Sequence, residues 1–273
     1  MHRRSLLLAP LAAGLSALAG CGAGGADPEN GDAMPDAQAT RTISYGSDPS
    51  QFGDLYLPDA APKGLAVIVH GGFWRAQYGL DLGAPLARSL QERGWAAWNI
   101  EYRRVGNGGG VPATLDDVRA AIAKTADFDL GVDTIVGIGH SAGGHLVTWA
   151  GGDPRGGVLT HVISQAGVVD LGAASAENLG DGAVAAFLGH PYGAADHDVD
   201  PIRMVPLDVP VWCVHGNEDT IVPISQSEAY VRAATAAGAR AELVRVDGDH
   251  FVVIDPASAA WARTLEILDG IVA

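Results

Sequence analysis

Short apolar runs alternate with amphipathic helical patterns along this chain, from about residue 41 to the end. The runs are rich in apolar residues and are bounded by Gly, Pro, Asn or Asp, which is typical of buried strands. The pattern predicts eight strands, at residues 42–45, 52–57, 65–70, 96–102, 134–139, 161–166, 211–215 and 241–246. Helical periodicity between the runs predicts helices at residues 82–93, 115–128, 225–237 and 257–268, and one more directly after Ser141.

Strands that alternate with helices favour an α/β fold, in which a mainly parallel eight-stranded sheet carries helices on both faces. No internal repeat is visible, so residues 41–273 are expected to form one domain. Residues 173–204 are polar, Gly-rich and weakly patterned. We expect this segment to be a lid or insertion that shapes a binding pocket.

Composition and charge restrict the classes of function. The chain has 273 residues, of which 48% are hydrophobic, so it can bury a large core and is not largely disordered. Its formal net charge of −15 would repel a phosphate backbone, and nucleic acid is therefore not an expected partner. Two cysteines, Cys21 and Cys213, exclude a scaffold held together by several disulfides.

The N-terminus has the pattern of an export signal. Two basic residues, Arg3 and Arg4, precede an apolar stretch at residues 6–18. This stretch is short and rich in Ala and Gly, whereas a transmembrane helix needs roughly 20 apolar residues. The arginine pair leaves open whether export follows the general secretory or the twin-arginine route.

The end of this signal, Leu-Ala-Gly-Cys at residues 18–21, resembles the bacterial lipobox, in which the cysteine thiol receives a lipid. We predict a lipoprotein signal peptide at residues 1–20, a flexible tether at residues 21–40 and a lipid anchor at Cys21. The protein would then be exported and held to a bacterial membrane from outside the cytoplasm. A plain signal peptide with an incidental cysteine is the alternative.

The sharpest chemical motif is Gly-His-Ser-Ala-Gly at residues 139–143. It joins a predicted strand to a predicted helix, which is the context of a nucleophile elbow. Ser141 would sit on a strained turn, where glycines on both sides avoid collisions. The amides and dipole of the following helix would face an oxyanion formed at this serine, so Ser141 is the candidate nucleophile.

A second glycine-rich turn, His-Gly-Gly-Phe-Trp at residues 70–74, follows an apolar strand. An oxyanion hole takes one amide from such a loop and one from the residue after the nucleophile, here Ala142. Gly72 and Phe73 are the expected loop donors. Gly71 is expected to give the turn its conformational freedom.

A serine nucleophile needs a base, and the base needs an orienting acid. Asp219 follows the predicted strand at residues 211–215, and His250 follows the last predicted strand. Because the carboxyl ends of parallel strands share one crevice, both side chains can reach Ser141. Asp170, at another strand end, is the alternative acid.

These segments together resemble the α/β-hydrolase fold family over residues 41–273, and within it the esterase and arylformamidase (kynurenine formamidase) branch. The resemblance implies that Ser141 is the nucleophile, Asp219 the acid and His250 the base, with no cofactor. The matching segments are HGGFW at 70–74, EYR at 101–103, GHSAGGHL at 139–146, HGNEDTIVP at 215–223 and GDHF at 248–251.

We therefore predict a serine hydrolase of carboxylic esters whose substrate is a small-molecule ester or amide. Trp74, Tyr78 and the segment 173–204 are the expected walls of its substrate pocket. The alternatives are an arylformamidase, a prolyl-oligopeptidase-like peptidase and a non-catalytic binding lipoprotein. His190 and His197 lie among aspartates, but their spacing matches no metal-ligand template, so no metal is expected.

Overall fold

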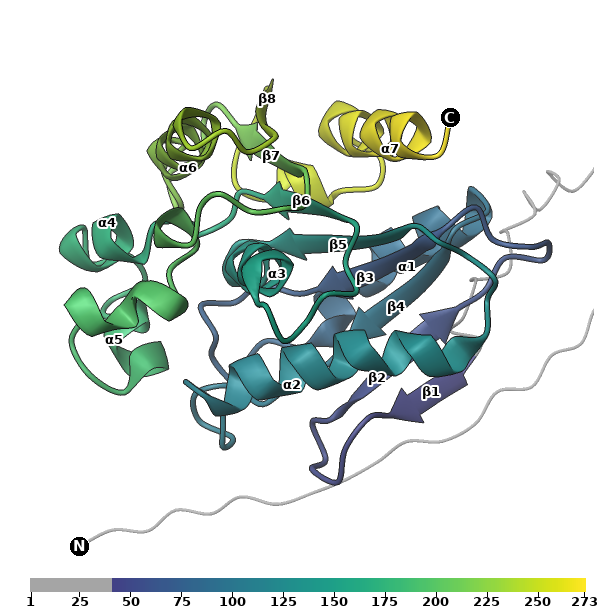
Figure 1. The fold of residues 1–273 in the computed structure, drawn as a ribbon, viewed down its shortest axis with the longest axis horizontal. Coiled ribbons are helices and arrows are strands. Elements are labelled where there is room, and N and C mark those ends of the chain that lie inside the picture. Colours follow the sequence, from purple (N-terminus) through teal and green to yellow (C-terminus); the bar gives the residue numbers. More distant parts are fainter. Residues whose placement is uncertain (1–40) are drawn as a thin grey trace, which may run out of the picture. The chain divides into compact units, whose positions relative to one another are not determined.

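The structure is a computed structural model that describes residues 41–273; the predicted signal peptide, tether and Cys21 lie outside the described residues. Its centre is an eight-stranded sheet in the order β1-β2-β4-β3-β5-β6-β7-β8 (Figure 1). The first two strands are antiparallel to their neighbours, and the other six run parallel. The strands are β1 (Arg41–Ser44), β2 (Phe52–Tyr56), β3 (Leu65–Val69), β4 (Ala96–Ile100), β5 (Ile135–His140), β6 (His161–Gln165), β7 (Val211–Gly216) and β8 (Ala241–Val246).

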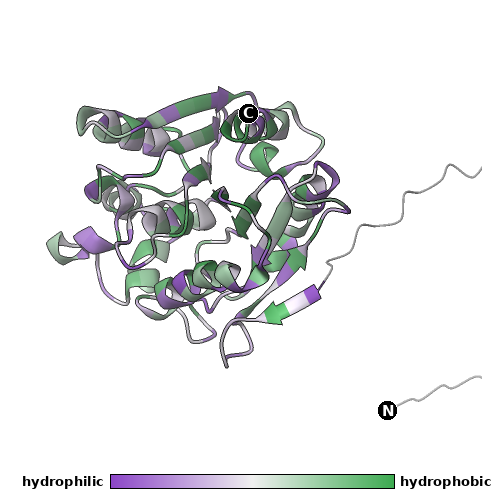
Figure 2. Ribbon diagram, turned by 45° about the vertical axis from the view of Figure 1, so that its right-hand side comes forward, coloured by the Kyte–Doolittle hydropathy of each residue, from purple (hydrophilic) through white to green (hydrophobic). Residues whose placement is uncertain are grey.

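Two hydrophobic cores lie on opposite faces of the sheet, because successive side chains of a strand point to opposite sides. On β3, Val67 belongs to one core and Ile68 to the other. Helices α2, α3 and α6 pack on the first face, and α1 and α7 pack on the second. The helices are α1 (Ala84–Glu92), α2 (Ala113–Ala123), α3 (Ala142–Gly152), α4 (Leu171–Ala176), α5 (Ala183–Leu188), α6 (Ser225–Ala236) and α7 (Ala259–Ile271). Figure 2 shows hydrophobic residues concentrated in the central strands.

The α/β class and the mainly parallel eight-stranded sheet are confirmed. The predicted helix at residues 115–128 begins two residues earlier, as α2, and its last part is the 3-10 helix Lys124–Phe128. Among residues 41–273, no helix is both long and apolar enough to cross a membrane.

The segment 173–204 is more ordered than its sequence pattern predicted. It holds most of α4, all of α5 and two short 3-10 helices, Ala194–Asp198 and Pro201–Arg203. Phe187 and Val184 of α5 are buried in the first core. The two α-helices have six residues each, so neither is long enough to show a helical period in the sequence. The role of this segment as a lid stays a prediction.

Candidate active site

Ser141 lies on the turn between β5 and α3, with φ 54° and ψ −118°, a strained conformation for a residue with a side chain. Its neighbours leave no space for larger residues. A Cβ atom added at Gly143 would lie 2.0 Å from the Val69 carbonyl oxygen, and one at Gly139 would lie 2.1 Å from the Gly143 oxygen. Any side chain at either glycine would collide with the backbone, so both positions require glycine. Ser141 itself is only 2% exposed.

Asp219 and His250 meet at the same edge of the sheet. His250, in the loop after β8, places its Nδ1 2.6 Å from Oδ2 of Asp219, in the loop after β7. The carbonyl oxygen of His250 accepts a hydrogen bond from Nε2 of His140, the residue before Ser141, at 2.9 Å. The rings of these two histidines are 4.5 Å apart. These contacts place His250 against Asp219 and against the residue that precedes Ser141, although the three positions lie far apart in the sequence.

The carboxylate of Asp219 is stabilised in its ionised form. Burial alone would raise its pKa, but hydrogen bonds from His215, His250 and the Val222 amide outweigh this effect, so the pKa lies well below its usual range. Its other oxygen, Oδ1, accepts from the amides of Ile221 and Val222 at 2.8 Å each. An ionised, fixed carboxylate is what a catalytic histidine needs as its orienting partner.

His215 is a buried neighbour of Asp219 that the sequence did not single out. It is fully buried, and its Nε2 lies 3.2 Å from Oδ2 of Asp219 and 2.9 Å from the Val222 carbonyl oxygen. Its Nδ1 contacts the Ser227 hydroxyl at 2.7 Å. The only signal in the sequence is its position four residues before Asp219, at the start of the HGNEDTIVP segment.

Asp170, the alternative acid, caps a helix and makes no hydrogen bond with His250 within residues 41–273. Its Oδ1 accepts from the Ala173 amide at 2.8 Å and thereby caps the N-terminus of α4. The structure therefore pairs His250 with Asp219. Burial also lowers the pKa of His140 to about 3, so this imidazole is too weakly basic to compete with His250 for the serine proton.

The glycine-rich loop after β3 lies directly against the nucleophile turn. A Cβ atom added at Gly71 would be 3.0 Å from Cβ of Ser141. Gly72, Phe73 and the following tryptophan all have positive φ values, of 109°, 53° and 56°. The amides of Gly72, Phe73 and Ala142 donate no backbone hydrogen bond within residues 41–273. Amides without an acceptor can donate to a developing negative charge, and their role as an oxyanion hole stays a prediction.

The two predicted pocket aromatics differ in exposure. Trp74 is 1% exposed and stacks on Phe187 at a centroid distance of 4.6 Å, so its ring belongs to the core and is not open to substrate. Tyr78 is 38% exposed and packs over Gly72. Phe251, which the sequence did not single out, is 54% exposed and lies edge-on to His250 at 5.3 Å. Tyr78 and Phe251 are the exposed large hydrophobic residues among residues 41–273.

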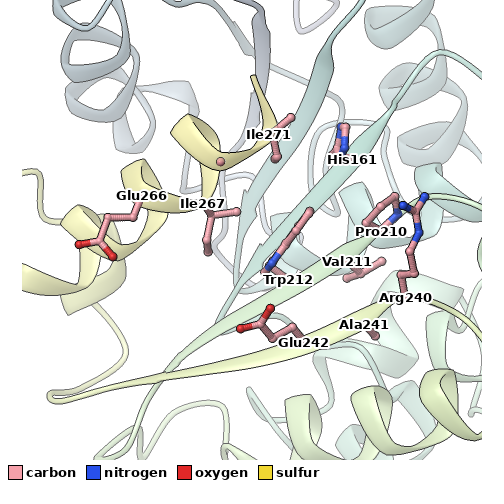
Figure 3. A pocket seen from close by; sticks show the side chains of 11 residues that line it. His161, Pro210, Val211, Trp212, Arg240, Ala241, Glu242, Glu266, Ile267 and Ile271 are labelled. Carbon is pink, nitrogen blue, oxygen red and sulfur yellow. The ribbon is translucent and has the colours of Figure 1, made fainter. Parts of the chain in front are cut away.

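A hollow of about 530 Å³ lies elsewhere, between the amino ends of β6–β8 and α7. Figure 3 shows Trp212 and Ile267 facing this hollow, with Glu242 at its rim. It is at the opposite end of the strands from Ser141 and is not part of the candidate site. No group of three His, Cys, Asp or Glu residues between positions 41 and 273 could hold a metal ion.

Comparisons with known proteins find a matching family, relatives that are named esterases and solved structures with the same fold. A family model described as BD-FAE matches residues 54–233. Esterase LipC of Mycobacterium tuberculosis is 29% identical over 227 residues, covering 72% of this chain and 55% of LipC. Esterase LipQ of the same organism is 32% identical over 233 residues, covering 74% of this chain and 54% of LipQ. The chain thus spans about half the length of the curated relatives it matches.

A solved structure described as a truncated form of a carbohydrate esterase from gut microbiota superposes with a TM-score of 0.75. It is 22% identical and covers 87% of this chain and 98% of its own. At this identity the likeness concerns the fold alone.

Proposed function

This chain belongs to the BD-FAE family, an α/β-hydrolase esterase family, and we propose that it hydrolyses carboxylic esters with Ser141, His250 and Asp219 as its catalytic triad. The observation that carries the proposal is the 2.6 Å hydrogen bond between His250 and Asp219, next to a serine on a strained strand-to-helix turn. The names of the curated relatives, LipC and LipQ esterases, support the reaction class. They do not favour the arylformamidase or peptidase alternatives.

In the proposed reaction, His250 takes the proton of the Ser141 hydroxyl through Nε2, and Oγ attacks the acyl carbonyl. The resulting oxyanion accepts hydrogen bonds from the amides of Ala142 and of the Gly72–Phe73 turn. His250 then gives its proton to the leaving alcohol, and Ser141 holds the acyl group. Water activated by His250 releases the acid and restores the serine. Asp219 keeps Nδ1 of His250 protonated and stabilises the imidazolium in both steps.

The substrate would be a small-molecule ester whose apolar part lies against Tyr78 and Phe251. This part of the proposal rests on the exposure of these two aromatic rings and on their contacts with Gly72 and His250. The segment 173–204 lies close by, since Cβ at Gly180 would contact the Phe73 ring at 2.4 Å. We propose that this segment covers one side of the bound ester.

The test is hydrolysis of p-nitrophenyl acetate by the purified full chain. Wild-type protein should be active, and Ser141→Ala should lose on the order of 10⁶-fold in kcat. Ser44→Ala, on the exposed edge strand β1, is the matched control and should keep full activity. An inactive wild-type protein, or a Ser141→Ala variant with substantial turnover, would contradict the proposal.

We also propose export and lipid anchoring at Cys21, which the lipobox-like residues 18–21 support. Expression of the full chain in a bacterial host should yield a membrane-bound protein whose mature N-terminus is a lipidated cysteine. Cys21→Ser should abolish lipidation and release the protein from the membrane fraction. A mature protein that begins at another residue, with Cys21 unmodified or removed, would contradict this assignment.

A further inference from the structure

Four carbonyl oxygens of the candidate oxyanion loop accept hydrogen bonds from the protein, whereas the amides of Gly72 and Phe73 have no acceptor among residues 41–273. A trans peptide is planar, so its C=O and N–H groups point in opposite directions. A contact that anchors the carbonyl of one residue therefore sets the direction of the next residue's amide. The anchored carbonyls and their donors are His70 with Tyr102 Oη (2.8 Å), Gly71 with His70 Nδ1 (2.8 Å), Gly72 with the Arg75 amide (2.9 Å) and Trp74 with the Val105 amide (2.8 Å).

The contact on the Gly71 carbonyl is the one that orients the Gly72 amide. Its donor is the buried imidazole of His70, which stacks on the Tyr102 ring with centroids 4.4 Å apart. The other ring nitrogen, Nε2, lies 3.1 Å from Oε1 of Glu101, at the carboxyl end of β4. A carbonyl oxygen can only accept a hydrogen bond, so Nδ1 donates to Gly71 while Nε2 faces the carboxylate of Glu101.

Glu101 is held as an ionised carboxylate under this loop. Burial would raise its pKa, but the contacts from His70, the Tyr102 amide and Arg104 outweigh burial and lower the pKa below its usual value. Arg104 lies 2.8 Å from Oε1, and the Leu80 amide donates to Oε2 at 3.2 Å. The carboxylate thus has enough partners to stay in place and to fix the imidazole ring.

We propose that Glu101 and His70 form a positioning pair that aims the Gly72 amide at the oxyanion of the reaction. This inference rests on the proposed ester hydrolysis. Neither side chain touches the substrate: Glu101 orients His70, His70 anchors the Gly71 carbonyl, and the Gly72 amide then donates to the transition state. The pair should therefore act on the transition state much more than on substrate binding.

The kinetic test uses Glu101→Gln, which keeps the shape of the side chain but removes its charge. Loss of an entire oxyanion donor costs about 10²- to 10³-fold in kcat, so a misdirected donor should cost about 10- to 100-fold, with KM within about threefold. Affinity for a trifluoromethyl ketone analogue of the ester should fall by the same factor as kcat/KM. Asp153→Asn is the matched control, because Asp153 is a carboxylate paired with Arg119 at the far end of α3, and its kcat should not change.

Two His70 variants separate the two halves of the pair. Asn places its amide nitrogen near the position of Nδ1 and can still donate to Gly71, whereas Gln places it near Nε2 and can contact only Glu101. His70→Gln should therefore show the 10- to 100-fold loss, and His70→Asn should retain distinctly more activity. Equal losses in the two variants, or wild-type kcat in Glu101→Gln, would overturn the proposal.

A spectroscopic test does not depend on turnover. Full-length protein with ¹⁵N-labelled histidine should show a slowly exchanging Nδ1 proton that is assigned to His70 by its absence in His70→Gln. This proton should exchange faster in Glu101→Gln, because the ring is then held less firmly. A His70 Nδ1 proton that exchanges equally fast in wild type and Glu101→Gln would overturn the pair. An inactive wild-type protein would refute the proposed function, and the NMR result alone would then decide whether Glu101 holds His70.

Discussion

Gly143→Ala is the substitution that most directly tests the packing of the nucleophile turn. The added Cβ would lie 2.0 Å from the Val69 carbonyl oxygen and 2.6 Å from that of His70. Real Cβ atoms stay at least 3.0 Å from such atoms, so α3 and the end of β3 must separate by 3.0 − 2.0 = 1.0 Å. Both contacts are with backbone, which cannot rotate away as a side chain can.

This displacement shifts the nucleophile turn relative to the candidate oxyanion loop, because β3 leads into that loop and α3 begins at Ala142, next to Ser141. A misplacement of about 1 Å costs on the order of 10²-fold in rate. Overpacking costs typically about 1–3 kcal/mol, which lowers Tm by roughly 2–12 °C in a domain of this size. We therefore expect Gly143→Ala to lose about 100-fold in kcat/KM and to unfold at a lower temperature.

The assay is p-nitrophenyl acetate hydrolysis together with thermal unfolding by circular dichroism. Gly152→Ala is the control, because it is the same substitution in the same helix. Its Cβ would meet the Met204 methyl group at 3.0 Å and Leu207 side-chain atoms at 3.3 Å, and these side chains can shift. Gly152→Ala should keep its activity. Wild-type kcat/KM in Gly143→Ala would refute the steric reasoning for the turn.

Three further predictions concern the acid and the buried thiol. Asp219→Asn should lose about 10⁴-fold in kcat, because the wrong tautomer of His250 is then favoured. Asp170→Asn should keep kcat within a few-fold of the wild-type value. If steady-state kinetics instead showed the larger loss for Asp170→Asn, Asp170 would be the catalytic acid. Because the folded pKa of Asp219 is lowered, its contribution to stability is present above the unfolded pKa of about 3.9 and is lost as the pH falls toward the folded pKa. Urea unfolding should therefore show a smaller stability difference between wild type and Asp219→Asn at pH 3 than at pH 7, and a constant difference would contradict the linkage. Burial raises the pKa of Cys213 to about 12, so peptide mapping should find it unalkylated by iodoacetamide at pH 8 in native protein and alkylated after unfolding.

The central strands could be predicted because their sequences are continuous apolar runs. All five residues of β3 and all five of β4 are buried, and a strand covered on both faces has this pattern. The candidate triad could be proposed from the order of the strands. Ser141, Asp219 and His250 each follow the carboxyl end of a parallel strand, β5, β7 or β8, so the topology of the sheet places all three at one edge.

The supporting contacts of the site could not be predicted, because they join residues that no local pattern connects. Glu101 and His70 are 31 positions apart on neighbouring strands, and His215 reaches Asp219 only because the loop after β7 folds back. Trp74 follows the loop glycines and would be expected at the substrate, yet its ring turns into the core against Phe187 of the unpredicted helix α5.

The most direct measurement of the central claim is the reaction of the full-length protein with a fluorophosphonate, followed by peptide mass spectrometry. The account predicts one phosphonyl group on Ser141 and a loss of p-nitrophenyl acetate hydrolysis in proportion to labelling. His250→Ala should label far more slowly, since it cannot take the proton from the serine. A protein that stays unlabelled, or whose label lies on another residue while hydrolysis continues, would contradict a serine esterase built on this triad.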